Sequence, residues 1–397
     1  MPGLRSSNTS RIALIFDIGS GSVGAALVQV AKTKPSVLWN TRKPFPFQSE
    51  LEYPRYRRGM LGTFSAVVRT VQTEGLPKLG ALKPQDIELV FASPWHVSQT
   101  ISVTFAEKEP HTVNEHLGEV SRLLKEKEQR LSKEIPGGGA ALLLEKKIVE
   151  MRLNGYPTAR PMGKTARTIK TSVLLSLFGV DIQQEIARSI EEIFRPSQEV
   201  RFHSFAGMFF SAVRDLFAEE EHFLILDVGS EVTDIGVVWD DVLGEMISFP
   251  FGKNSVFRAV SDALKTDPAE VEARISLYRS GKSEPKESEK IRAALSVAER
   301  AWQERFTKAI GELSRIVAVP RSVFLTADPD LGEWFRVAVL ECTVNAFAIG
   351  ASNFNVVLLT PEHFNGLIDV APGTAPDSFL DIEALFIHKN ADNPVVE

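Results

Sequence analysis

The sequence of 397 residues contains little cysteine and no long apolar segment. Cys342 is its one cysteine, so the chain forms no internal disulfide and no thiolate metal cage. No run approaches the roughly 18 apolar residues of a membrane-spanning helix. The polar first ten residues lack the apolar core of a signal peptide. These absences predict a cytoplasmic protein that does not insert directly into a membrane.

An excess of basic residues is also absent. The net charge is −6 at pH 7, which gives no overall attraction to nucleic acid or to an anionic membrane. The mix of 44% hydrophobic and 24% charged residues is instead that of an ordinary globular protein. The length fits two to four domains, and we expect a multi-domain α/β protein that does not bind nucleic acid.

Two segments of the chain share one pattern. Residues 11–30, RIALIFDIGSGSVGAALVQV, place an apolar run, an aspartate, a glycine- and serine-rich turn and a second apolar run in succession, which predicts a β-hairpin. Residues 223–239, FLILDVGSEVTDIGVVW, repeat this order at an offset of 210 residues. The matching pairs are Asp17 and Asp227, Gly19 and Gly229, and Ser20 and Ser230. A duplication at this spacing predicts two similar half-domains.

The repeated turn has the chemistry of an anion and metal site. Glycine lets the backbone come close to a ligand, and successive N–H groups of such a turn bind anions. Ser20, Ser22 and Thr233 add hydroxyl donors, and Asp17 and Asp227 are hard oxygen ligands suited to Mg²⁺. Two such turns, facing each other across a cleft, would hold the phosphates and the metal of a nucleotide.

A dinucleotide-binding fingerprint is a competing interpretation of the first turn, because Gly19, Gly21 and Gly24 have the required spacing. That motif opens a helix and is followed about 20 residues later by an acidic residue. Here a strand is predicted to follow, and no Asp or Glu occurs between Asp17 and Glu50. The hairpin is therefore the preferred interpretation.

Residues 17–23 (DIGSGSV) and 227–234 (DVGSEVTD) resemble the two phosphate motifs of the actin-like ATPase superfamily, in particular its FtsA/PilM branch of cell-division and type IV pilus assembly proteins. Residues 249–252 (FPFG) resemble that branch's turn before a helix. The resemblance implies an actin-like (ribonuclease H-like) α/β fold with two lobes and a small α+β insert. It implies a first lobe at residues 10–96, the insert at 97–196, and a return to the first lobe followed by the second lobe at 197–397, with a helical part at about 254–320.

The resemblance also implies the site and the function. ATP and Mg²⁺ are the expected cofactors, with Asp17 and Asp227 holding the metal through water and Asp234 positioning water or metal. The expected phosphate contacts are Gly19, Ser20, Gly21, Ser22, Gly229, Ser230 and Thr233. No residue stands out as a hydrolytic base, so weak ATPase activity is the most that we expect. The implied function is a cytoplasmic adaptor, recruited to the inner face of the membrane through protein partners of a division or pilus machine, with self-association or filament formation left open.

Two alternatives remain open. Glu231 stands where the family usually has glycine, and residues 327–330 (ADPD) replace a glycine-rich adenosine turn. Both departures favour a pseudo-ATPase that acts only as an interaction module. The first turn is also similar to that of exopolyphosphatase- and kinase-like enzymes of the superfamily, which would be phosphotransfer enzymes.

The remaining pattern predicts elements around the two hairpins. We expect strand and loop over residues 32–60, a helix from 63 to 74, and a helix over 334–348. Residues 379–389 (FLDIEALFIHK) form a short apolar segment with an acidic pair and no basic face, so they do not resemble the membrane-targeting helix of FtsA.

Overall fold

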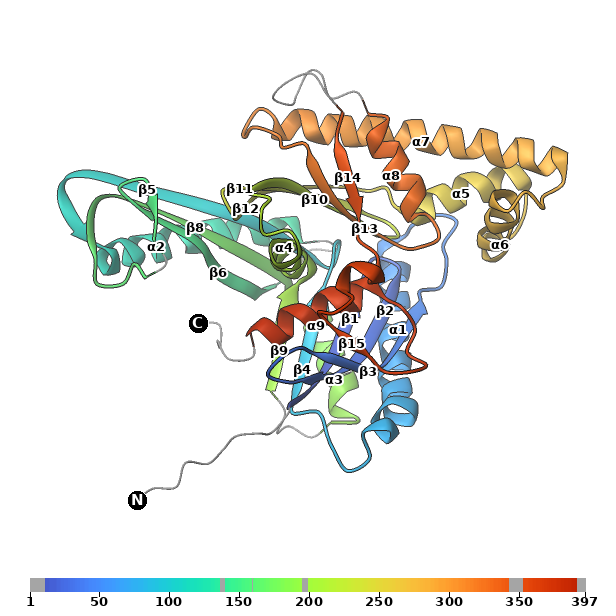
Figure 1. Ribbon diagram of the computed structural model, residues 1–397, viewed down its shortest axis with the longest axis horizontal. Helices are drawn as coiled ribbons and strands as arrows, with labels where there is room; N and C mark the ends of the chain where they lie inside the picture. Colours follow the sequence, from blue (N-terminus) through green and yellow to red (C-terminus); the bar gives the residue numbers. More distant parts are fainter. Residues whose placement is uncertain (1–10, 136–139, 159, 195–198, 343–352, 391–397) are drawn as a thin grey trace.

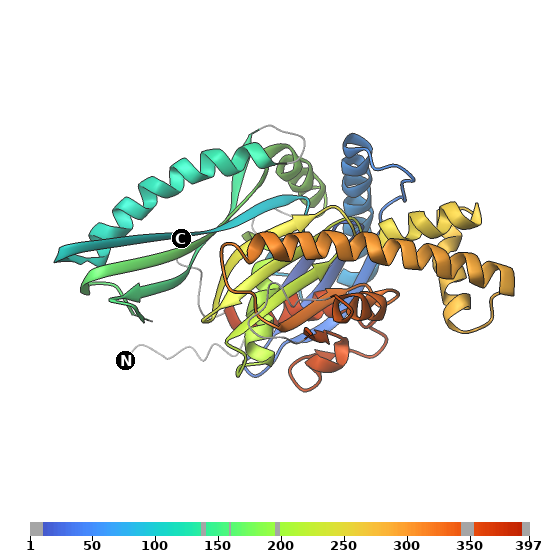
Figure 2. The ribbon, with the colours of Figure 1, turned by 90° about the horizontal axis from the view of Figure 1, so that it is seen from above.

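The computed structural model describes residues 11–135, 140–158, 160–194, 199–342 and 353–390. Its strands form three sheets of six, five and four strands (Figure 1). The first and second sheets each contain one of the predicted hairpins, and the third sheet projects to one side with a single long helix along it (Figure 2).

The first sheet is built around the hairpin of residues 11–30. Parallel and antiparallel neighbours flank β1, which pairs with β2 on one side and β4 on the other. Every β1 residue after Arg11 is buried, because helices cover both faces of the sheet. In pairing order the strands are β15 (Asp369–Val370), β3 (Ser36–Pro44), β2 (Ser22–Val30), β1 (Arg11–Ile18), β4 (Asp86–Phe91) and β9 (Glu199–Ser204).

The second sheet repeats this arrangement. β10 pairs antiparallel with β11 and parallel with β13, as β1 pairs with β2 and β4. In pairing order the strands are β12 (Val242–Phe249), β11 (Thr233–Trp239), β10 (His222–Val228), β13 (Ser322–Ala327) and β14 (Asn355–Leu358). The two half-domains predicted from the offset of 210 residues therefore share a common sheet core.

Helices fill the space between the two sheets and cover their outer faces. α4 (Phe205–Leu216) and α9 (Ser378–Asn390) share one apolar core with both sheets and lie between them (Figure 1). α1 (Tyr53–Thr70) and α3 (Val180–Glu191) cover the outer face of the first sheet. The outer face of the second sheet packs against α5 (Lys253–Leu264), α6 (Pro268–Arg279), α7 (Pro285–Leu313) and α8 (Gly332–Leu340).

The third sheet and α2 form the inserted unit. Its strands are β5 (His96–Thr112), β8 (Thr165–Gly179), β6 (Ala141–Leu153) and β7 (Tyr156–Pro157), and α2 (Val113–Leu131) packs on one face. α2 begins at a capping box between Thr112 and Glu115, which satisfies two N–H groups at its start.

The inserted unit contacts both other sheets. Thr100 donates to the carbonyl of Leu243 in β12 over 2.8 Å, and Arg152 donates to Asp240 over 2.6 Å. On the other side, Ser204 at the end of β9 donates to Glu145 over 2.7 Å. The proposed boundaries of the insert, residues 97 and 196, enclose α3 as well, although α3 packs against α1 on the first sheet.

Several predicted elements need correction. Both hairpins and their turns are confirmed. α1, however, begins at Tyr53 and not at residue 63, so the second half of the predicted loop is helical. Pro54 lies in the first turn of α1, where its missing N–H leaves no helical hydrogen bond unmade. The helix predicted at 334–348 is present as α8 up to Leu340, and its residues 343–348 lie outside the described residues.

The C-terminal segment is a buried element of the core. Its residues from Leu380 to Ile387 are all buried in α9 between the two large sheets. In the parts of the chain that the structure describes, no helix combines the length and apolar character needed to cross a membrane.

Candidate functional site

The two repeated turns have the same backbone geometry. In the first, Asp17 pairs with Gly24 across the hairpin, and the Gly19 N–H donates to the Ser22 carbonyl over 3.0 Å. The second turn repeats both features 210 residues later. Asp227 pairs with Asp234, and the Gly229 N–H donates to the Val232 carbonyl over 2.9 Å. The duplication inferred from the sequence therefore extends to the backbone hydrogen bond that closes each turn.

The turns face each other, as predicted, and they touch. The Glu231 N–H donates to Ser20 Oγ over 3.1 Å. A side chain on Gly21 would collide with Ser230, and one on Gly229 would collide with Ser20. Gly21 thus leaves room for Ser230, and Gly229 leaves room for Ser20. The two turns lie too close together for a phosphate chain to fit between them.

A small cavity remains beside this contact. Its volume is about 30 Å³, which is room for about two water molecules. Except for Thr233, every predicted site residue lines it: Asp17, Gly19, Ser20, Gly21, Ser22, Asp227, Gly229, Ser230 and Asp234. Thr233 is fully buried elsewhere; its hydroxyl donates to the Phe251 carbonyl over 2.6 Å and accepts from Trp302 over 3.2 Å.

The first acid of the site is paired with a guanidinium group. Arg42 of β3 donates from Nη2 to Asp17 Oδ2 over 2.7 Å. The same side chain holds both oxygens of Asp377, at 2.7 and 3.0 Å, and donates to the Ser22 hydroxyl over 3.0 Å. Burial raises the pKa of Asp17 and the Arg42 charge opposes this, while Asp377 and Asp17 raise the pKa of Arg42 well above its usual value despite burial.

A second carboxyl group backs this ion pair. Glu383 of α9 has no exposed surface, and its carboxyl group lies near enough to Asp17 for the two acids to affect each other. Burial and the negative charge of Asp17 raise the pKa of Glu383 well above its usual range.

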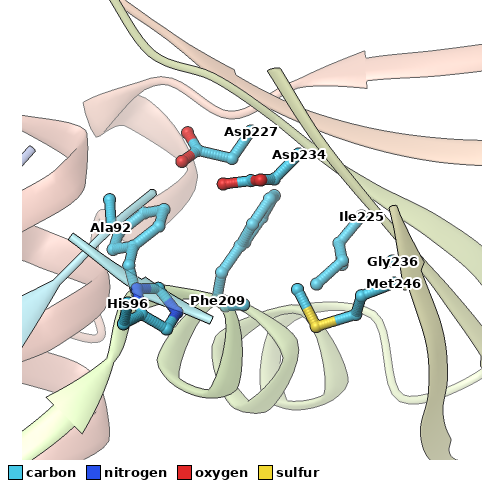
Figure 3. Close-up of a pocket in the computed structure, with 10 residues that line it drawn as sticks. Ala92, His96, Phe209, Ile225, Asp227, Asp234, Gly236 and Met246 are labelled. Carbon is cyan, nitrogen blue, oxygen red and sulfur yellow. The ribbon is translucent and has the colours of Figure 1, made fainter. Parts of the chain in front are cut away.

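The second acid of the site has hydroxyl partners, and no cation among the described residues pairs with it. Asp227 accepts from Thr326 over 2.9 Å, and Asp234 accepts from Ser248 and from Ser93. Figure 3 shows the side chains of Asp227 and Asp234 side by side. Burial, with the neighbouring Asp234, raises the pKa of Asp227 well above its usual value, and burial also raises that of Asp234.

A second cavity of about 10 Å³ lies below these two carboxyl groups (Figure 3). His96 of β5 and Phe209 of α4 form part of its wall, together with Met246 of β12. Burial lowers the pKa of His96 to about 4, so the imidazole is neutral at physiological pH. The side chains of His96, Phe209 and Met246 that lie below Asp227 and Asp234 are thus uncharged.

The carboxylate of Glu231 is paired with neighbouring side chains and does not present an unpaired charge to the cavity. Arg258 of α5 donates to its two oxygens over 2.6 and 2.9 Å, and Asn254 donates over 2.8 Å. Arg258 also donates to the Gln48 carbonyl over 2.9 Å. Gln48 precedes α1 in the first half, and Arg258 belongs to α5 in the second half. Arg258 therefore connects the two halves.

The segment expected to hold adenosine is occupied by ion pairs as well. Lys253 Nζ lies 2.7 Å from Asp328 and 3.4 Å from Asp330. Asp328 also lines the cavity. The loop after β13 thus presents paired carboxylates at the place where a glycine-rich turn was expected.

These residues do not fit Mg²⁺ and ATP in the arrangement described. The predicted metal ligand Asp17 is engaged by Arg42, the two turns touch, and the cavity is far smaller than the several hundred Å³ of a nucleotide-sized pocket. Among the described residues, no group of three or more His, Cys, Asp or Glu side chains is arranged to hold a metal ion. Binding of ATP and Mg²⁺ stays a prediction, and the geometry argues against it.

The fold places the chain among proteins with the actin-like ATPase architecture, as the resemblance implied. A chain of the PilM–PilN type IV pilus biogenesis complex is similar over 98% of this chain and 100% of its own, with a TM-score of 0.64 and 15% sequence identity. A Bacteroides thetaiotaomicron protein with an actin-like ATPase fold and unknown function (TM-score 0.44, 8% identity, 97% and 99% coverage) and ethanolamine utilization protein EutJ from Carboxydothermus hydrogenoformans (0.42, 10%, 98% and 90%) are more distant. No protein-family model and no curated protein matches the sequence. At these identities the likeness shows the fold alone.

The sequence did not reveal the residues that neutralise the site. Arg42 and Arg258, which pair with its acids, lie in segments with no motif, and the further acids Asp377 and Glu383 come from the loop before α9 and from α9 itself. The one available signal was Gly24, which lacks a side chain opposite Arg42 in the pairing of β2 with β3.

Proposed function

We propose that this chain is a PilM-like adaptor that recruits a protein partner to a type IV pilus assembly machine at the cytoplasmic face of the membrane. The observation that carries the proposal is the fold similarity to a chain of the PilM–PilN complex over the full length of both chains, at a TM-score of 0.64. That structure is a pilus biogenesis complex, so pilus assembly is the setting that we prefer to cell division. The closed and internally paired cleft supports a scaffold in preference to an enzyme.

The edge of β6 is the docking site that we propose for the partner. β8 pairs along β6 on one side, whereas β7, among the described strands, pairs with the other side at Arg152 and Leu153. Leu142, Leu143 and Ile148 on β6 are 37%, 46% and 48% exposed. An unpaired strand edge with exposed apolar side chains suits an extended segment that adds to the sheet as a further strand.

The inserted unit is also held firmly enough to present such an edge. Its hydrogen bonds to Leu243, Asp240 and Ser204 connect it to both large sheets. A partner bound to β6 would therefore be fixed relative to the whole molecule.

A phosphotransfer enzyme is the less favoured alternative. Such an enzyme needs room for a phosphorylated substrate and a carboxylate that is free to act as a base. The cavity of about 30 Å³ lacks that room, and two of the carboxylates that line it, Asp17 and Asp328, are paired with Arg42 and Lys253.

The test is calorimetric titration of the full chain with the cytoplasmic segments of inner-membrane pilus proteins encoded beside it. We expect one segment to bind, and we expect Leu143→Asp to weaken its binding at least tenfold. Val297→Asp on α7 is the matched control, because Val297 is 56% exposed and lies outside the inserted unit. If no segment binds, or if both variants weaken binding equally, the proposal is refuted.

A further inference from the structure

Arg42 is held more completely than an ordinary surface arginine. Its side chain makes two hydrogen bonds to Asp377, one to Asp17 and one to Ser22, all between 2.7 and 3.0 Å. Its guanidinium also lies over the ring of Phe379, 5.3 Å from the ring centroid. The cation is thus surrounded by oxygen atoms and capped by an aromatic ring.

The first hairpin is shaped to admit this cation. Gly24 pairs with Arg42 across β2 and β3, and a β-carbon on Gly24 would lie 2.8 Å from Arg42 Nη2. The equivalent pair in the second hairpin is Asp234 and Ser248, which hydrogen-bond to each other. The two hairpins otherwise share their geometry. The pairing of Gly24 with Arg42 is therefore specific to the first half.

The oxygen atoms around Arg42 are those that a divalent metal ion prefers. Carboxylates and hydroxyl groups are typical ligands of Mg²⁺ and Mn²⁺. Asp17 and Asp377 supply two carboxylates, Ser22 a hydroxyl and Glu383 a further carboxyl group beside Asp17. Asp17 and Ser22 line the cavity beside Arg42, and without the guanidinium the carboxylates of Asp17 and Asp377 would have no positive charge to balance them.

We propose that Arg42 is a built-in cation, which takes the place of a divalent metal ion at the first turn and keeps Asp17 and Asp377 paired without metal or nucleotide. The other cations beside the turns complete the arrangement, since Arg258 neutralises Glu231 and Lys253 neutralises Asp328. Each of these three cations is thus supplied by the chain itself, whereas Asp227 and Asp234 have hydroxyl partners. This inference does not depend on the identity of a partner.

The experiment is a titration of the full chain with MnCl₂, followed through the electron paramagnetic resonance signal of free Mn²⁺. We expect the wild type to bind no Mn²⁺ at this site up to about 1 mM. Arg42→Gln removes the charge and keeps a similar shape, so we expect it to bind one Mn²⁺ at least tenfold more tightly than the wild type. Asp17→Asn in the same chain should remove that gain. Arg336→Ala, which breaks an exposed pair with Glu333, is the control and should not differ from the wild type.

Two results overturn the inference. One is a wild-type Mn²⁺ site that Asp17→Asn abolishes, because Arg42 would then not occupy the metal position. The other is a folded Arg42→Gln variant, checked by circular dichroism, that binds no more Mn²⁺ than the wild type. If that variant does not fold, the comparison of the wild type with Asp17→Asn still decides, since a site lost in Asp17→Asn refutes the proposal and the absence of a site in both supports it. Partner binding by the wild type is a separate result, so failure here and failure of the adaptor function are distinguishable.

Discussion

The two hairpins of this protein share one backbone and differ in how their charges are balanced. Both place an aspartate at the end of a buried strand, followed by the same hydrogen-bonded turn. In the first, Asp17 meets the guanidinium of Arg42, whereas in the second Asp227 meets the hydroxyl of Thr326 and the carboxyl group of Asp234. A duplicated scaffold can therefore keep its geometry while its two copies acquire opposite charge environments. Two aspartates in the same environment could share a ligand. Here Asp17 already has a cation as its partner, whereas Asp227 has a hydroxyl group.

Loss of Arg42 should have the largest effect on stability. Arg42→Ala leaves Asp17 and Asp377 buried without their cation, and removing one partner of a buried ion pair costs about 3–5 kcal/mol. We expect the free energy of unfolding in urea to fall by that amount. Ser248→Ala removes the equivalent residue of the second hairpin and should cost only about 1 kcal/mol, the value of one hydrogen bond. Equal losses in the two variants would contradict the asymmetry described here.

α9, which shares an apolar core with both large sheets, gives a pH-dependent prediction. Burial, with the nearby Asp377, raises the pKa of Asp381 from 3.8 to about 7. The folded state therefore holds this proton more tightly than the unfolded state, and the wild type loses stability as the pH rises from about 4 to 7. Asp381→Asn removes that loss.

We expect Asp381→Asn to be more stable than the wild type by up to about 4 kcal/mol at pH 8, because one pKa unit corresponds to about 1.4 kcal/mol. The difference should vanish near pH 3.5, where Asp381 is protonated in both states. Urea unfolding at the two pH values measures it. A gain that is the same at both pH values would show that Asp381 is not the titrating group.

A smaller effect should come from the glycine that admits the guanidinium. Gly24→Ala places a methyl group 2.8 Å from Arg42 Nη2, and overpacking of this kind costs about 1–3 kcal/mol. Gly62→Ala in α1 is the matched control, since nothing lies within 4 Å of its new methyl group. The control should gain about 0.5–1 kcal/mol from higher helix propensity. If Gly24→Ala leaves the free energy of unfolding unchanged, Arg42 is not confined by the hairpin.

The hairpins and their contact could be predicted from the sequence, because each is encoded by a short local pattern. Apolar runs around an aspartate and glycines specify strand, turn and strand, and the offset of 210 residues indicated that the turns belong together. The start of α1 was missed because residues 32–60 were all expected to be strand and loop, although Pro54 is favourable in the first turn of a helix.

The charge partners could not be predicted, because they depend on register and on distant parts of the chain. Arg42 reaches Asp17 only through the pairing of β2 with β3, and that register is set by burial of the whole sheet. Asp377 lies 335 residues from Arg42 in the sequence. Thr233 shows the opposite error, since its place in the motif suggested a ligand contact and its hydroxyl instead joins the core.

The distance along the chain between Arg42 and Asp377 also sets an order of events during translation. The β1–β2 hairpin leaves the ribosome early, and domains generally fold from the N-terminal side as they emerge. The carboxylate that completes the grip on Arg42 is synthesised 335 residues later, just before α9. Until then Arg42 has Asp17 and Ser22 as partners but lacks Asp377, so the set of ion pairs around it is completed only after residue 377 has been synthesised.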